Sequence, residues 1–286
     1  TFALLTKRMR SLCYSPDFTA TTGSSPAAVG NRVGAAAVAA GRNDGSNESL
    51  HYADPTYVPV NAPLVVSQPG STVHDQTFWQ PLAVARGGQS FVGAQWGHVR
   101  TFAHRVTIRV PTLGTAAYKQ AAIAVLRATA RKHTFGVGTS PLAWNRVAIA
   151  SASGNLAHDL RLYLALNGAL NDAAVTTWGA KRASQAPRPI SMIRYLAFNG
   201  GLPRTESRWT SPLPTPASPG GVAEASAFAY AADTVLTALT GRSFERQAQA
   251  ASAEALAGGI DVPEDIVVGR TVGQKVGKLA LAKSGG

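Results

Sequence analysis

Apolar side chains recur at helical spacing over much of the chain. After Ser25-Pro26, a serine cap with proline at the first helical position, alanines and valines recur every three or four residues up to residue 42. The same spacing predicts helices in further segments: residues 115–133, 155–185, 222–240, 243–257, the segment from Pro263 onward, and a short N-terminal helix at residues 1–12. The pattern predicts an all-α protein.

Two of these segments carry the strongest apolar patterns, and we expect them to form the core. Within residues 155–185 the pattern predicts a single buried stripe, made of Leu156, Leu160, Tyr163, Leu164, Leu170, Ala174 and Trp178. Residues 222–240 form the second pattern, and Gly241 closes it.

The segment from Pro263 combines a valine-rich stripe with evenly spaced glycines. The stripe consists of Val268, Val272, Val276 and Leu279, and the glycines, four residues apart, are Gly269, Gly273 and Gly277. Glycine in a helix interior costs about 1 kcal/mol relative to alanine. We therefore expect another helix to approach closely across the glycine face.

A long irregular region separates the first helices from the later ones. Residues 43–98 are rich in glycine, asparagine, proline and aspartate, and this stretch is far longer than an ordinary connection within a domain. We therefore predict two parts. Residues 1–110 form an N-terminal helix and a long irregular connector packed on the bundle, and residues 111–286 form the helical bundle.

Composition excludes several classes of protein. With 286 residues and 45% hydrophobic content, the chain can bury a core. The single cysteine, Cys13, can form neither an internal disulfide nor a usual structural zinc site. Every apolar stretch is interrupted before it reaches the length of about 18 residues that a membrane span needs. We expect no metal and no membrane-spanning segment.

The charge balance is strongly basic. Lysine and arginine outnumber aspartate and glutamate by 27 to 15, a net charge of +12, which favours anionic partners. The basic residues are scattered and form no known nucleic-acid module. A basic, alanine-rich chain that begins at Thr1 fits a processed protein of an organelle interior, such as a mitochondrial complex. A cytoplasmic protein or a bacterial oligomer is the alternative.

One motif resembles a known family. Lys181 and Arg188 stand seven residues apart, and Pro189-Ile190 follows the arginine. In the vanadium-dependent haloperoxidases, which share a superfamily with acid phosphatases, a lysine and an arginine in this arrangement bind vanadate oxygens. Other stretches resemble the family in the same order, over about residues 15–280: residues 22–40, 44–47, 57–61, 79–82, 95–103, 164–182, 188–196, 215–219, 227–241 and 258–273. The resemblance implies a haloperoxidase-type helical bundle.

The same resemblance implies that most of the anion site is lost. The family has a Ser-Gly-His run where this chain has Ala223-Glu224-Ala225, a second arginine where it has Ala255, and the vanadium-ligating histidine where it has Asp261. None of the six histidines lies after residue 158. We expect no vanadate, no other cofactor and no active catalytic residue. The remnant anion-site positions are Lys181, Arg188, Ala223, Glu224, Ala225, Ala255 and Asp261.

Two interpretations of the charged remnant residues remain open. Glu224 and Asp261, with Lys181 and Arg188, could form a converted site that binds a metal or performs acid/base chemistry. A cluster of buried ion pairs is the interpretation we favour, with Lys181 and Arg188 pairing with Glu224 or Asp261.

These observations predict a non-catalytic pseudoenzyme that acts as a structural or accessory subunit of a larger assembly. The early helices of the family are missing, so we expect exposed faces on residues 155–185 and 222–240, covered by other protein subunits, with anionic lipid or RNA at the rim. One alternative is a haloperoxidase or acid phosphatase whose site another chain completes. A second is a basic RNA-associated protein, such as a ribosomal accessory subunit.

Overall fold

A computed structural model describes residues 2–85, 87–131, 133, 135–136 and 140–285. They form two compact units, Thr1–Tyr52 and Ala53–Gly286. The first contains α1 (Phe2–Ser11), α2 (Pro26–Gly41) and the short 3₁₀ helix η1 (Glu48–Leu50). Ser25 caps α2 as predicted, since its hydroxyl accepts a hydrogen bond from Ala28 N at 3.3 Å.

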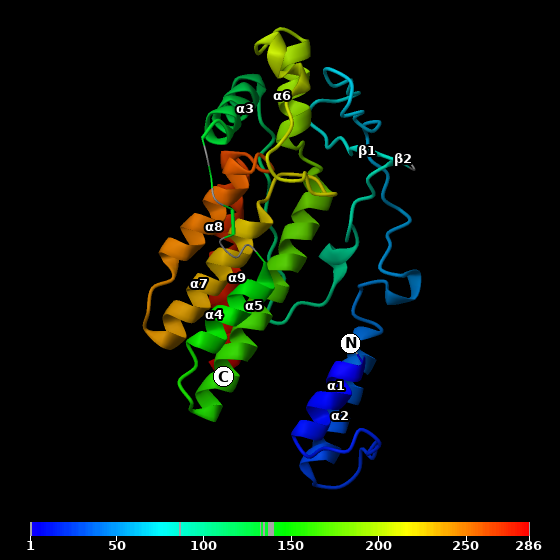
Figure 1. The fold of residues 1–286 in the computed structure, drawn as a ribbon, viewed down its shortest axis with the longest axis vertical. Helices are drawn as coiled ribbons and strands as arrows, with labels where there is room; N and C mark the ends of the chain where they lie inside the picture. Colours follow the sequence, from blue (N-terminus) through cyan, green and yellow to red (C-terminus); the bar gives the residue numbers. More distant parts are fainter. Residues whose placement is uncertain (1, 86, 132, 134, 137–139, 286) are drawn as a thin grey trace. The chain divides into compact units, whose positions relative to one another are not determined.

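The second unit is a helical bundle (Figure 1). Its helices are α3 (Thr115–Thr129), α4 (Pro141–Ala150), α5 (Leu156–Ser184), α6 (Pro189–Phe198), α7 (Glu224–Thr240), α8 (Glu245–Ala257) and α9 (Pro263–Gly285). Two 3₁₀ helices, η2 (Trp96–His98) and η3 (Arg204–Arg208), and the antiparallel pair β1 (Ala83–Val84) and β2 (Gly87–Gly88) complete it. The predicted all-α class is confirmed. No helix in the described part of the chain has the length and apolarity to cross a membrane.

The predicted helices are present, although some of their ends differ. The helix predicted at residues 115–133 ends at Thr129, and residue 132 of that prediction lies outside the described residues. The pattern did not predict α4 and α6. Each is ten residues long and begins at a proline, which has no N–H to leave unpaired at a helix start.

Helices α5, α7 and α9 pack against one another at the centre of the bundle, and α8 packs on α7 (Figure 1). The glycine face of α9 lies directly on α7. A Cβ atom added at Gly273 would stand 2.5 Å from the carbonyl oxygen of Ala227, and one added at Gly269 would stand 2.4 Å from that of Ala223. The predicted close helix approach is confirmed.

The stripe predicted as the core face of α5 is wrong in its first half. Leu156, Leu160 and Leu164, here called the leucine stripe, are 75%, 58% and 53% exposed. The buried face instead carries a series of mostly smaller residues: Leu162, Ala165, Leu166, Ala169 and Ala173. Alanine at three of these five positions allows α7 and α9 to approach closely, and the leucines of this face, Leu162 and Leu166, are fully buried.

The face of α7 that we expected to be exposed is buried. Nearly all of its residues from Ala225 to Leu236 are shielded by α5, α8 and α9. On the three central helices, the exposed large apolar side chains are therefore the leucine stripe of α5 and Val267 of α9, and none lies on α7. Leu142 and Ile149 of the neighbouring α4 are also exposed.

Buried polar groups fix the irregular residues 53–110 to the helices. The carboxylate of Asp172 on α5 accepts hydrogen bonds from Phe102 N at 2.6 Å and Ala103 N at 2.9 Å. The guanidinium of Arg194 on α6 donates to four carbonyl oxygens, two of them in the connector at Val66 and Gln68. The connector thus supplies partners that these buried side chains require.

Candidate functional site

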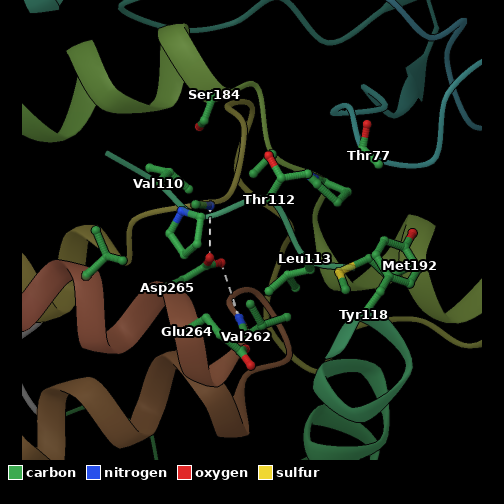
Figure 2. Close-up of a pocket in the computed structure, with 15 residues that line it drawn as sticks. Thr77, Val110, Thr112, Leu113, Tyr118, Ser184, Met192, Val262, Glu264 and Asp265 are labelled. Carbon is green, nitrogen blue, oxygen red and sulfur yellow. Dashed lines mark hydrogen bonds between the residues drawn. The ribbon is translucent and has the colours of Figure 1, made fainter. Parts of the chain in front are cut away.

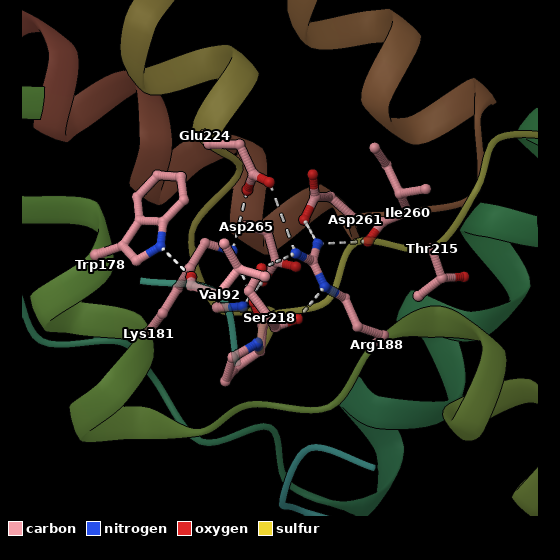
Figure 3. A network of polar contacts seen from close by, with 12 residues as sticks. Val92, Trp178, Lys181, Arg188, Thr215, Ser218, Glu224, Ile260, Asp261 and Asp265 are labelled. Carbon is pink, nitrogen blue, oxygen red and sulfur yellow. Dashed lines mark hydrogen bonds and ion pairs between the residues drawn. The ribbon is translucent and has the colours of Figure 1, made fainter. Parts of the chain in front are cut away.

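A cluster of buried charged residues lies where several helices end (Figure 3). Lys181 is in the last turn of α5, and Arg188 caps α6. Glu224 is the first residue of α7, and Asp261 lies in the loop between α8 and α9. Lysine near a helix C-terminus and glutamate at an N-terminus both complement the helix dipole. Residues from four parts of the sequence are thereby brought together, as the charge-cluster interpretation predicted.

Arg188 is the centre of the cluster and is completely buried. Its Nη1 donates to Asp261 Oδ1 at 2.5 Å and to the carbonyl oxygen of Ile260 at 2.8 Å. Its Nε donates to the carbonyl oxygen of Ser218 at 2.9 Å, and its Nη2 donates to the Ser218 hydroxyl at 3.0 Å. The Glu224 carboxylate is 3.7 Å from Nη2. The guanidinium therefore joins the loop before α7 to the loop before α9.

Lys181 is also completely buried and has two oxygen partners. Its Nζ is 3.0 Å from Glu224 Oε2 and donates to the carbonyl oxygen of Pro219 at 2.7 Å. The predicted pairing of Lys181 and Arg188 with Glu224 and Asp261 is confirmed. Each cation of the motif has at least one carboxylate partner within the chain.

The acidic side chains of the cluster respond differently to burial. Burial would raise the pKa of Glu224, but attraction by Lys181 and Arg188 outweighs it and lowers the pKa to about 2. Burial raises the pKa of Asp261 to about 7, because Arg188 is shared with Glu224 and compensates only in part. Burial likewise raises the pKa of Asp265, in the first turn of α9, to about 6. Burial lowers the pKa of Lys181, and repulsion by Arg188 adds to this.

A cavity of about 160 Å³ adjoins the cluster. Its lining comprises Leu213, Glu224, Ala225, Glu254, Ala255, Ile260 and Asp261. The structure thus brings four of the remnant positions to one cavity, Glu224, Ala225, Ala255 and Asp261. Ala223 is not in this lining. It is buried under α9, where its carbonyl oxygen lies close to Gly269.

A smaller cavity, of about 40 Å³, lies at the start of α9 (Figure 2). Asp265 forms part of its lining, and its carboxylate accepts hydrogen bonds from Gly221 N at 3.0 Å and Val262 N at 3.3 Å. These bonds fix the loop before α7 and the start of α9. Asp265 therefore has a structural role that explains its burial.

The sequence prediction missed three members of this region. Pro219 acts through its carbonyl oxygen, and Ser218 acts through its carbonyl oxygen and its hydroxyl. No residue pattern identifies a carbonyl oxygen as a partner. Asp265 follows Pro263 in the first helical turn, a common place for an acidic residue, and that position was the available signal. Among the described residues, no group of three or more histidine, cysteine, aspartate or glutamate side chains is arranged to hold a metal ion.

Comparison with known proteins agrees with this architecture. Residues 161–256, which extend from α5 into α8, match the family described as the VCPO second helical-bundle domain. This match includes Lys181, Arg188, Glu224 and Ala255, whereas Asp261 lies beyond it. No curated protein matches the chain.

Solved structures of bacterial vanadium-dependent enzymes have a similar fold. The holo-type bacterial vanadium-dependent chloroperoxidase is 20% identical with a TM-score of 0.80, covering 99% of this chain and 77% of that one. Its apo-type form gives the same identity and TM-score, with 99% and 78% covered. A bacterial vanadium-dependent iodoperoxidase is 21% identical with a TM-score of 0.60, covering 76% of this chain and 63% of that one.

The fold is therefore that of a vanadium haloperoxidase helical bundle. The family match covers residues 161–256, and the structural matches show the same fold over the rest of the bundle.

Proposed function

We propose that this chain is a non-catalytic relative of the vanadium haloperoxidases and acts as a structural or accessory subunit of a larger protein assembly. The observation that carries the proposal is the internal pairing of the two buried cations. Arg188 is bound to Asp261, and Lys181 is bound to Glu224. In this arrangement, the positive charges that would hold an oxyanion are already neutralised.

The residues present do not fit a vanadate or phosphate group. To contact Arg188 and Lys181, an oxyanion would have to displace two carboxylates and leave them unpaired in a buried environment. Breaking a buried pair in this way costs about 3 to 5 kcal/mol. The described lining of the adjoining cavity offers carboxylates and apolar side chains, and it includes no histidine to bind vanadium.

The leucine stripe supports the second half of the proposal. Three large apolar side chains, four residues apart on α5, face outward instead of entering the core. Contiguous exposed apolar surface of this kind is typical of protein interfaces. Full burial of an exposed leucine side chain contributes about 1.5 to 3 kcal/mol, and a partner chain that covers the stripe would gain the part of this that matches the exposed fraction of each leucine.

An activity assay tests the catalytic half. Purified protein with vanadate, peroxide and bromide is expected to leave a phenol indicator unbrominated, and it is expected to leave an aryl phosphate intact. Both rates should equal those of a Lys181→Ala, Arg188→Ala double variant and of a protein-free blank. Turnover above both references would refute the proposal and favour an enzyme whose site another chain completes.

The association state tests the interaction half. Native protein is expected to elute as a complex larger than the 29.6 kDa chain on size-exclusion chromatography with light scattering, in low and in high salt. Leu160→Lys should release the partner. Val267→Lys, an equally exposed apolar position on α9, is the matched control and should retain it. A stable monomer in both salts would defeat this half, and release by salt alone would favour an RNA partner.

A further inference from the structure

The cavity beside Asp261 has one charged side and one apolar side. Carboxylates of Glu224, Glu254 and Asp261 form the charged side. The apolar side consists of Leu213, Ala225, Ala255 and Ile260. Its volume of about 160 Å³ is close to the roughly 150 Å³ of a protein cavity that accepts a six-carbon molecule. The cavity is therefore large enough for a small organic ligand.

One polar atom in this cavity wall lacks a partner. Asp261 uses Oδ1 to accept from Arg188, while its Oδ2 is buried and has no hydrogen-bond partner among the described residues. The side chain is only 1% exposed. Figure 3 shows this second oxygen directed away from Arg188, on the side between Glu224 and Ile260. A buried carboxylate oxygen without a donor is unfavourable, so the position favours a ligand that donates.

The charged residues around the cavity determine which sign of ligand charge is favoured. Two cations, Lys181 and Arg188, face the three carboxylates of Glu224, Asp261 and Asp265, and Glu254 adds a fourth carboxylate at the cavity. Full ionisation therefore leaves an excess of negative charge. Glu224 is 22% exposed, so the charged side is open to solvent and a polar head can enter there.

We propose that this cavity binds a small aliphatic ammonium ion. The ammonium group donates to Asp261 Oδ2 within the negative potential of Glu224 and Glu254, and the hydrocarbon chain lies against the apolar side. A metal ion is disfavoured, because no three histidine, cysteine, aspartate or glutamate side chains among the described residues are arranged to hold one. The inference goes beyond the accessory role and concerns a ligand of opposite charge to vanadate.

Isothermal titration of the full-length chain tests the ligand class, with n-butylammonium chloride as the probe. We expect saturable binding with a dissociation constant on the order of 1 mM, and a raised melting temperature. Butan-1-ol has the same chain without the charge, and butyrate has the opposite charge, so both should bind at least about tenfold more weakly. Absence of n-butylammonium binding, or tighter binding of butan-1-ol, butyrate or calcium, would overturn the proposal. Tight vanadate binding would instead overturn the proposed function.

Variants locate the site. Asp261→Asn removes the acceptor charge, and Ala255→Leu fills the apolar side without a change of charge. Each should weaken n-butylammonium binding by about tenfold or more. Glu245→Gln removes an exposed glutamate at the far end of the same helix, α8, and should bind as the parent does. If Asp261→Asn fails to fold, the affinity of Ala255→Leu for n-butylammonium tests the location of the site. An unchanged affinity in that variant would show that the ligand binds elsewhere and would refute the proposal.

Discussion

Replacement of Arg188 by alanine should strongly destabilise the bundle. The change deletes five polar contacts of a fully buried side chain and leaves Asp261 without its cation. Removal of one member of a buried ion pair costs about 3 to 5 kcal/mol. For a unit of this size, 1 kcal/mol lowers the melting temperature by about 2 to 4 °C, so a decrease of about 6 to 20 °C is expected.

Tryptophan fluorescence during thermal and urea unfolding would measure this loss. All five tryptophans belong to the unit Ala53–Gly286, so the signal follows the unit that contains Arg188. Arg246→Ala on the exposed surface of α8 is the matched control, and its effect should stay within about 0.5 kcal/mol. A loss for Arg188→Ala as small as that of the control would mean that the side chain is hydrated, and the pairing argument would be wrong.

A double-mutant cycle with Asp261→Asn separates the ion pair from the other contacts of Arg188. Once the carboxylate is neutral, loss of the guanidinium no longer leaves a buried charge unpaired. The double variant should therefore be more stable than the sum of the single losses predicts, by about 1 to 3 kcal/mol. Additive losses would show that the carbonyl contacts at Ser218 and Ile260 account for the whole effect.

Four other perturbations give measurable results. Because the pKa of Asp261 is raised to about 7, the folded state holds a proton on this carboxyl more tightly than the unfolded state does. The stability that this proton contributes is lost as pH rises from about 4 to 7. The melting temperature of Asp261→Asn should therefore change less than that of the parent over this pH range, and an equal change would contradict the argument. For Glu224 the lowered pKa gives the opposite sign, with stability lost as pH falls from about 4 to 2, and Glu224→Gln should remove that loss. Gly273→Ala should lower the free energy of unfolding, measured by urea titration, by about 1 to 3 kcal/mol because its Cβ would meet a carbonyl of α7. Gly34→Ala, with nothing within 4 Å of the added Cβ, should not lower it. Arg194→Ala should speed proteolysis of residues 53–110 relative to Arg246→Ala, and equal digestion would show that Arg194 does not hold the connector.

Local sequence signals predicted most of the helices. Ser25-Pro26 marks the start of α2, and the valine and glycine spacing from Pro263 predicts both α9 and its close contact with α7. The same capping signal stands at Ser140-Pro141, where α4 begins, but the apolar spacing after it is too short to predict a helix by itself. At Arg188-Pro189 the proline was interpreted as part of an anion-binding motif rather than as the beginning of α6.

The spacing of apolar residues does not determine which face of α5 is buried or which charged residues pair. Leucines lie on two faces of the first half of α5, and spacing alone did not show that Leu162 and Leu166 enter the core while Leu160 and Leu164 stay exposed. The resemblance identified which charged residues would meet, and the structure brings them together. It could not show that Asp261 pairs with Arg188 while Glu224 pairs with Lys181. That pairing depends on the conformations of loops that come from different parts of the sequence.

The anchors of the connector share no residue with the charge cluster. Asp172 and Arg194 hold residues 66–68 and 102–103 without any contribution from Lys181 or Arg188. Selection on chemistry and selection on architecture can therefore act on separate residues in this molecule. When the ligand-binding residues and the fold-stabilising residues are separate, a few substitutions at helix ends can change the ligand specificity while the fold stays the same.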